Sequence, residues 1–248
     1  MSGSGEKHNP ISQFEVKSIV DLELAGFDIS LTNSALYMII ATSLIIFFML
    51  FATRKKSLVP SKLQVVAESI YNFVFDMIKG TIGSEGTKFF PFIFSLFTLI
   101  LICNLLGMLP YSFTATSQIA VTLSLALVSF LVLVAFAIYR NGFFGFLGMF
   151  VPAGIPWWMA PLIFTIEIFS FFMRPVTLSV RLFANMVAGH VLLKIVAGFV
   201  ISLGVAFGIL PFLFSVLMTG FEIFIALLQA YIFTILVCAY LGDATKEH

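Results

Sequence analysis

Ionisable side chains are rare in the C-terminal part of the chain, and three of them are spaced for one face of a helix. Residues 89–242 contain only six: Arg140, Glu167, Arg174, Arg181, Lys194 and Glu222. Glu167, Arg174 and Arg181 follow one another at intervals of seven residues. Each therefore lies only about 20° around an α-helix from the next. Asn185, four residues after Arg181, stays near the same stripe.

A second polar stripe follows on a later apolar segment. Ser215, Glu222 and Gln229 repeat the interval of seven residues, and Thr219 lies beside them. In otherwise apolar helices such stripes normally face the interior of a bundle or an aqueous cavity rather than lipid. Polar pairs that only hold helices together would explain an isolated Gln229 or an isolated Asn185. They explain less well a Glu, an Arg and a His distributed over two helices.

Arg181 is the most unusual of these residues because its sequence neighbours are apolar. Val180 and Leu182 flank it directly. An arginine at this depth of a membrane costs at least about 2.5 kcal/mol unless it faces water or a partner charge. One interpretation is a structural arginine that snorkels to the surface or is paired inside the protein. The interpretation we favour is an ion-pathway residue.

His190 is a candidate for proton transfer. It lies about 180° around the helix from Arg181, so the two side chains should not share a face. An antiparallel last helix would bring Glu222 to a similar depth. An imidazole with a pKa of about 6.5 beside a carboxylate is suited to passing protons. A lone histidine is more often structural, and it is the pairing with Glu222 that favours a relay.

The composition of the chain identifies the environment of these residues. The 248 residues are 60% hydrophobic and 10% charged, with a mean hydropathy of +1.12. An average soluble domain carries about 25% charged residues. A soluble enzyme, a nucleic-acid binder and a disordered tail are therefore excluded. The net charge is +1, and Cys103 and Cys238 lie in apolar runs, which argues against a disulfide framework. We predict an integral membrane protein.

The predicted fold is all-α, with about five membrane-crossing helices and one interfacial amphipathic helix. Residues 1–34 would form an external N-terminal segment and 35–248 a single membrane domain. The predicted spans are about 35–53, 90–109, 119–139, 157–193 and 211–241. The last two are long enough that they must tilt strongly, bend or extend beyond a hydrocarbon core of about 30 Å. Pro175 is one place for a bend, and residues 194–208 would form their external connection.

The interfacial helix is predicted over about 62–79. Apolar side chains recur there at helical spacing, with polar side chains opposite, as Leu63, Val66 and Ile70 face away from Gln64 and Glu68. Such a helix lies at a membrane surface or packs on its own bundle, and both alternatives remain open.

Basic residues set the expected orientation. Arg54-Lys55-Lys56 after the first span and Arg140 after the third should be cytoplasmic. Residues 143–158 would form an interfacial connection. Five crossings then leave the N-terminus outside and residues 243–248 in the cytoplasm. His190 and Glu222 would lie on the external side of Arg181, and Glu167 on the cytoplasmic side.

Three motifs resemble those of one family, subunit a of F-type ATP synthases. The most specific are the segment Arg181-Leu182-Phe183-Ala184-Asn185 through Gly189-His190 and the segment Glu222 through Leu228-Gln229-Ala230-Tyr231. Asn104-Leu105-Leu106-Gly107-Met108-Leu109-Pro110 is similar to a less specific motif at the end of an earlier span. The resemblance covers nearly the whole chain from the first span onward.

The resemblance implies roles for six residues. Arg181 corresponds to the required arginine of the family, Gln229 to its last-helix glutamine and Asn185 to its asparagine. His190 lies on the arginine helix and Glu222 on the last helix, as in the mitochondrial-like arrangement, whereas some members have the opposite order. Glu167 resembles the acid in the opening to the other compartment.

The resemblance also implies the setting. The chain would be a non-catalytic, proton-translocating stator subunit, of the mitochondrial-like bacterial type. Its partners would be an oligomeric c-ring, b-type peripheral stalk subunits, the rest of the ATP synthase and the lipid bilayer, with no nucleic acid. We expect no cofactor and no metal, and the chain has no P-loop for a nucleotide. The expected location is the bacterial inner membrane, with the mitochondrial inner membrane as the alternative.

Three other functions were weighed. A self-contained secondary transporter predicts inverted repeats with broken helices, which the sequence does not suggest. An intramembrane hydrolase predicts motifs such as His-Glu-x-x-His or Gly-x-Ser-x-Gly, and neither occurs. A purely structural assembly subunit cannot be distinguished by the chemistry of these residues alone.

Overall fold

The computed structural model describes residues 18–20, 23–24, 27–28, 30–54, 60–109, 112–148, 150, 156 and 158–245. Most of the predicted external segment 1–34 lies outside the described residues. So do Lys55 and Lys56 of the predicted cytoplasmic cluster, Trp157 at the predicted start of the fourth span, and residues 246–248 at the C-terminus.

Two short antiparallel strand pairs precede the first helix. β1 (Ser18–Val20) pairs with β4 (Leu31–Thr32), and β2 (Glu23–Leu24) pairs with β3 (Phe27–Asp28). The last strand leads directly into α1 (Asn33–Thr53), because Thr32 caps that helix by accepting a hydrogen bond from the backbone N–H of Ala35 at 3.3 Å. The strands therefore fix only the start of α1.

The rest of the described chain is helical, which confirms the all-α prediction. Five helices are long and apolar enough to cross a membrane, counting η2 and α3 as one. The elements after α1 are α2 (Lys62–Thr81), η2 (Ser84–Phe89), α3 (Phe90–Gly107), η3 (Ala115–Ser117), α4 (Ile119–Gly148), α5 (Ala160–Ser202) and α6 (Gly204–Thr245).

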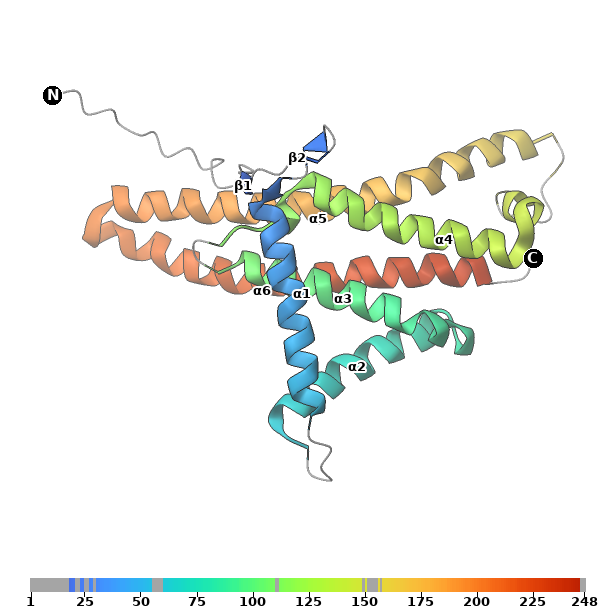
Figure 1. Cartoon of the computed structure of the whole chain (residues 1–248). Helices are drawn as coiled ribbons and strands as arrows, with labels where there is room; N and C mark the ends of the chain where they lie inside the picture. Colours follow the sequence, from blue (N-terminus) through green and yellow to red (C-terminus); the bar gives the residue numbers. More distant parts are fainter. Residues whose placement is uncertain are drawn as a thin grey trace.

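The two longest helices form an antiparallel hairpin that lies crosswise to α1 (Figure 1). α4 runs beside them, while α2 and α3 lie on the other side of α6. α5 has 43 residues and α6 has 42. Each is about 60 Å long at about 1.5 Å per residue, roughly twice the hydrocarbon thickness. Helices of this length and direction cannot share the inclination of α1 in a bilayer.

The turn between α5 and α6 is much tighter than the predicted connection over residues 194–208. Both helices continue into that range, and the reversal occurs at Leu203 and Gly204. Gly204 has φ +66°, a conformation that favours glycine. Gly208 allows the backbones of α5 and α6 to approach each other, because a Cβ at this position would lie 2.8 Å from the Val200 carbonyl oxygen. Pro175 and Pro211 lie inside continuous helices.

α4 also extends beyond its predicted end at Tyr139. Gly142 interrupts the helix with φ +69°, and helical geometry then resumes as far as Gly148. Residues 143–148 of the predicted interfacial connection are thus a helical turn after a kink.

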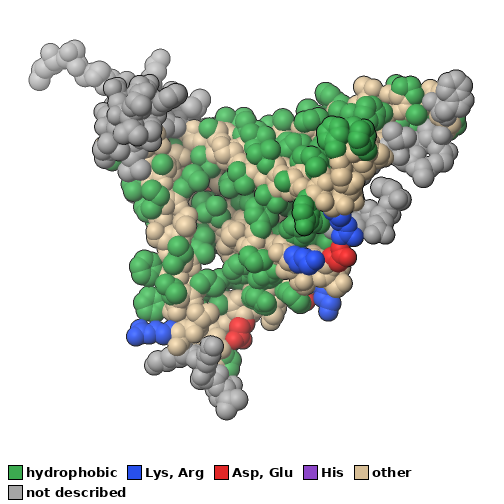
Figure 2. Space-filling view, turned by 45° about the vertical axis from the view of Figure 1, so that its right-hand side comes forward, with side chains coloured by type: hydrophobic (Ala, Val, Ile, Leu, Met, Phe, Trp, Pro, Cys, Tyr) green, Lys and Arg blue, Asp and Glu red, His purple; other side chains and the backbone are tan. Residues whose placement is uncertain are grey.

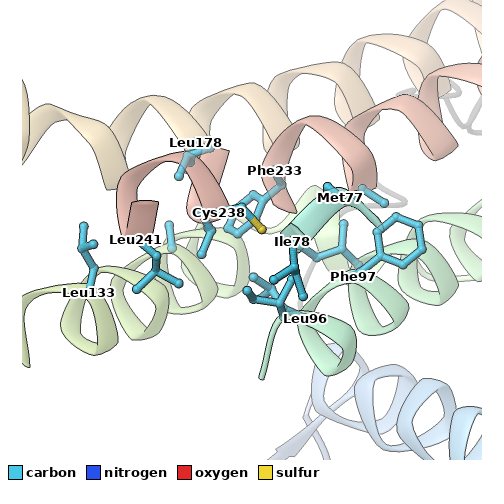
Figure 3. Close-up of a cluster of buried hydrophobic side chains, with 14 of the residues drawn as sticks. Met77, Ile78, Leu96, Phe97, Leu133, Leu178, Phe233, Cys238 and Leu241 are labelled. Carbon is cyan, nitrogen blue, oxygen red and sulfur yellow. The ribbon is translucent and has the colours of Figure 1, made fainter. Parts of the chain in front are cut away.

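The hydrophobic core surrounds the C-terminal half of α6 (Figure 3). Phe233, Cys238 and Leu241 project from α6 among side chains of four other helices. The labelled partners are Met77, Ile78, Leu96, Phe97, Leu133 and Leu178. Because these side chains are almost fully buried, the core holds α6 in one position against α2, α3, α4 and α5.

α2 packs on the bundle through one side only. Ala67, Val74, Met77 and Ile78 are buried against the other helices. Other apolar side chains of the helix remain exposed, among them Leu63, which is 54% exposed. On the face shown in Figure 2, hydrophobic side chains are spread over the whole body, and the few charged groups lie in its lower half. Such a surface fits lipid or other membrane subunits.

Candidate functional site

Two contacts set the register of the α5–α6 hairpin. A Cβ at Gly189 would lie 2.6 Å from Glu222 Oε1, so the backbone of α5 and the side chain from α6 are in direct contact. Further from the turn, the Arg174 guanidinium carbon lies 4.3 Å from the ring centroid of Tyr240 on α6. Any residue between Gly189 and Arg174 on α5 therefore lies level with a residue between Glu222 and Tyr240.

Three of the six predicted site residues line one cavity between α5 and α6. Asn185 and His190 come from α5, and Glu222 comes from α6. The cavity has a volume of about 280 Å³, and the rest of its wall is mostly apolar. Water occupies about 30 Å³ per molecule in the liquid and needs two to four polar partners to be held inside a protein. The cavity has the size and the polar groups to hold several water molecules.

The carboxyl group of Glu222 lies against a backbone rather than a side chain. Only a glycine at position 189 leaves room for it, because any Cβ there would overlap Glu222 Oε1. That oxygen is buried, and no group of the described chain forms a hydrogen bond with it. A buried carboxyl oxygen without a protein partner is a costly arrangement. Within the described residues, this oxygen therefore forms no hydrogen bond that would hold α5 and α6 together.

His190 contacts a loop that contains none of the six predicted site residues. Its Nε2 lies 3.0 Å from Thr114 Oγ1, which comes from the segment between α3 and η3. The same hydroxyl lies 3.2 Å from the carbonyl oxygen of Gly107, the last residue of α3. Gly107 belongs to the Asn104–Pro110 motif, which is the only signal in the sequence that pointed to this part of the structure.

Asn104, the first residue of that motif, connects α3 to α6. It is fully buried and donates a hydrogen bond from Nδ2 to the Ala226 carbonyl oxygen at 3.3 Å. Ala226 lies one helical turn after Glu222. The motif therefore fixes the position of α6 at the cavity as well as the loop that carries Thr114.

Arg181 lies on the outside of this chain. Its side chain is exposed, and within the described part of the chain it forms no ion pair and no hydrogen bond. The hairpin register places it within about one turn of Gln229, which is buried with 6% of its surface exposed. At Arg181 the predicted polar stripe thus faces away from the interior of this chain. In a membrane, water or a group on another chain must stabilise this charge.

Glu167 is not brought together with the other five residues. It is half-buried on α5, fourteen residues before Arg181 and therefore about 21 Å away along the helix. It does not line the cavity that contains Glu222. Arg174 lies between the two and packs its guanidinium group on the rings of Phe171 and Tyr240, which is a cation–π arrangement.

The described residues contain no group of three histidine, cysteine or acidic side chains that could hold a metal ion. An ion pair joins Arg140 to Glu85. It connects the C-terminal part of α4 with η2, at a distance along the chain from the cavity residues.

The fold and these residues define a class. The chain is a multi-pass α-helical membrane protein in which Asn185, His190 and Glu222 line a cavity between two long helices, and an exposed arginine lies on the outer surface of this hairpin. Residues 35–242 match the family described as ATP synthase A chain. The chain belongs to that family. It is a proton-translocating subunit of an ATP synthase and part of that membrane complex.

Proposed function

We propose that this chain forms two offset half-channels that load and unload carboxylates on a rotating c-ring, and so couples proton-motive force to ATP synthesis. The external half-channel includes Asn185, His190 and Glu222, and the cytoplasmic one opens near Glu167. Arg181, with Gln229 at its level, separates them. The observation that supports this most directly is the combination of a cavity lined by Asn185, His190 and Glu222 with an exposed Arg181 side chain that forms no ion pair or hydrogen bond within the described residues.

The electrostatics of an arginine explain the separation. A ring carboxylate that faces lipid is protonated, because an unpaired charge there is costly. Beside Arg181, which is always charged, the anionic form is favoured and the proton leaves. A proton then crosses only by travelling with the ring. One charge moved through 100 mV is worth about 2.3 kcal/mol, and several such steps supply the energy of one ATP.

The outer surface near Arg181 supports a moving partner. Val180 and Ala184 are exposed on either side of it on α5. These side chains are apolar and contain no charge that would compete for Arg181. A ring of small helices with one carboxylate each is the partner whose chemistry fits this surface. Peripheral stalk subunits of b type are the second proposed partner, and the resemblance is their support.

The proposal is tested by replacing Arg181. We expect Arg181→Ala to abolish ATP-driven proton pumping in membrane vesicles while the assembled complex is still recovered. An exposed substitution usually changes the free energy of unfolding by less than about 0.5 kcal/mol. Arg181→Lys should also fail, because an ammonium group loses its proton more readily and lacks the planar fork of donors.

Lys194→Gln is the matched control, because it removes an exposed cation from the same helix. We expect it to keep at least about half of the pumping rate, as is usual for surface changes. Normal pumping by Arg181→Ala or Arg181→Lys would refute the separating role. A complex that no longer assembles with Arg181→Lys would favour a structural assembly subunit instead.

A further inference from the structure

We propose that Thr114 is a positioning residue for His190, which keeps the proton of the neutral imidazole on Nε2. The inference rests on the proposed place of His190 in the external half-channel, and it adds a residue and a protonation geometry to that site.

The Thr114 hydroxyl has two partners but only one proton. Oγ1 lies 3.0 Å from His190 Nε2 and 3.2 Å from the carbonyl oxygen of Gly107. A carbonyl oxygen can only accept, whereas an imidazole nitrogen can donate or accept. Both contacts are hydrogen bonds only if Thr114 donates to Gly107 and accepts from His190. Nε2 must then carry the proton.

The carbonyl of Gly107 depends on this donor. Gly107 is the last residue of α3, and its carbonyl is one of the four at a helix end that have no partner within the helix. Ser112 is the other hydroxyl nearby, with Oγ 3.1 Å from the same oxygen. It lies closer to the carbonyl oxygens of Leu106 and Leu109, at 2.6 and 2.7 Å, and donates there. Thr114 is therefore the better-placed donor to Gly107.

Close packing in this loop restricts the side chain of Thr114. A Cβ at position 107 would lie 2.5 Å from Thr114 Cγ2 and 2.7 Å from Oγ1, so only glycine admits the threonine. Thr114 itself is buried, with 4% of its surface exposed. Its carbonyl accepts hydrogen bonds from the backbone N–H and the hydroxyl of Ser117 in η3, at 3.1 and 2.6 Å. A side chain held in this way fixes the direction of its hydroxyl oxygen.

The functional consequence concerns which imidazole nitrogen of His190 takes up and releases a proton. The partner of one imidazole nitrogen decides which nitrogen carries the proton. With Nε2 held by Thr114, a proton taken up by His190 arrives at Nδ1 and leaves from Nδ1. A ring free to change tautomer or rotate would lose that constraint and would exchange protons less often in the correct geometry.

The test is the tautomer of His190 in the full chain. The sequence has only three histidines, so replacing His8 and His248 by glutamine leaves His190 as the single one. Solid-state NMR of the ¹⁵N-histidine-labelled chain in lipid bilayers, well above the ordinary imidazole pKa of about 6.5, reports which nitrogen is protonated. We expect Nε2–H. A spectrum of the Nδ1–H tautomer would overturn the proposal without any mutation of Thr114.

Variants at Thr114 separate positioning from folding. Thr114→Val keeps the shape but removes the hydroxyl, and the tautomer ratio should shift by about fivefold or more, the size of one hydrogen bond. Thr114→Ser should retain the wild-type tautomer. Thr122→Val is the matched control, because Thr122 is also buried and forms a hydroxyl bond between helices, 3.1 Å to Ser179. An unchanged tautomer in Thr114→Val, or an equal shift in Thr122→Val, would overturn the proposal.

Proton flux in the assembled complex gives the second measurement. Thr114→Val should alter the pH profile of flux, and Thr114→Ser should restore it. If His190→Gln leaves flux intact, the proposed path through His190 fails, while the tautomer result still decides what Thr114 does.

Discussion

Glu222 and His190 lie on different helices and share one cavity, which makes their coupling a question that single replacements cannot answer. His190 is held by Thr114 on one side, and Glu222 rests against the backbone of Gly189. Neither contact is a bond between the two side chains. Proton transfer between them would pass through the space of the cavity, about 280 Å³.

If these two residues form one relay, their replacements will not be additive. We expect the losses of proton flux in His190→Gln and Glu222→Gln to couple by about 0.5–3 kcal/mol in a double-mutant cycle, the range for residues that act together. The exchange of His190→Glu with Glu222→His should recover more flux than either single change, because both groups would remain in the cavity. Additive losses without recovery in the exchange would show that the residues act separately.

At the residue scale the sequence predicted part of the arrangement. The antiparallel last helix was expected to bring Glu222 to the depth of His190, and both line one cavity, but Asn185, which was placed on the stripe of Arg181, lines that cavity as well. Thr114 was not predicted, since a hydroxyl in a loop is common and its two partners are 7 and 76 residues away in sequence. The outward direction of Arg181 was not evident either. Helical periodicity gives the angle of a side chain around its own helix, but not which side the neighbouring helices cover.

Gly189 on α5 is in direct contact with the side chain of Glu222 on α6. A glycine inside a helix is normally destabilising by about 1 kcal/mol relative to alanine, so its use here indicates a need for space. The need is visible, because a Cβ would lie 2.6 Å from Glu222 Oε1. The packing of α5 against α6 and the position of the Glu222 carboxyl group therefore both depend on Gly189.

Gly189→Ala tests that link. We expect little loss of stability, since the atom in the way is the flexible end of a side chain and alanine favours the helix. The carboxyl group of Glu222 must move, however, and proton flux should fall by about tenfold or more, because small displacements of reacting groups are costly. Thermal denaturation and proton pumping of the same preparation measure the two effects.

Gly198→Ala is the control on the same helix, because a Cβ there has no neighbouring atom within 4 Å. It should leave flux unchanged and raise stability slightly. If Gly189→Ala pumps normally, the position of the Glu222 carboxyl does not matter for transport. If both variants lose flux equally, α5 is sensitive to substitution in general.

Helix identities were predictable from hydrophobic run length, whereas the ends of the last two helices were not. Residues 194–208 were expected to form the connection between the predicted spans 157–193 and 211–241. The structure reverses direction at Leu203 and Gly204 instead. This turn requires only one glycine with a positive φ, and the residues before and after it are apolar. The sequence therefore contains no clear signal for its position.

At the scale of the whole molecule, the directions of the helices bear on the proposed function. α1 and the α5–α6 hairpin have very different directions (Figure 1). A hairpin inclined in the membrane would place Glu167, Arg181 and Glu222 at different positions along the membrane as well as at different depths. This arrangement suits the proposed pair of half-channels, which must be offset sideways if a proton is to travel with the ring between them.

The orientation of the chain is the last prediction, and it decides which compartment each half-channel serves. Five crossings place the N-terminus outside and the C-terminus in the cytoplasm, with Arg140 on the cytoplasmic side. His190 and Glu222 then lie on the external side of Arg181.

Single-cysteine variants labelled with an impermeant thiol reagent measure this orientation directly. Cys103 and Cys238 are buried and are replaced by alanine to remove any background. A cysteine at Ser4 should react only from outside, and one at Thr245 only from inside. Reaction of both from the same side would mean an even number of crossings, and the two half-channels would then have to be reassigned.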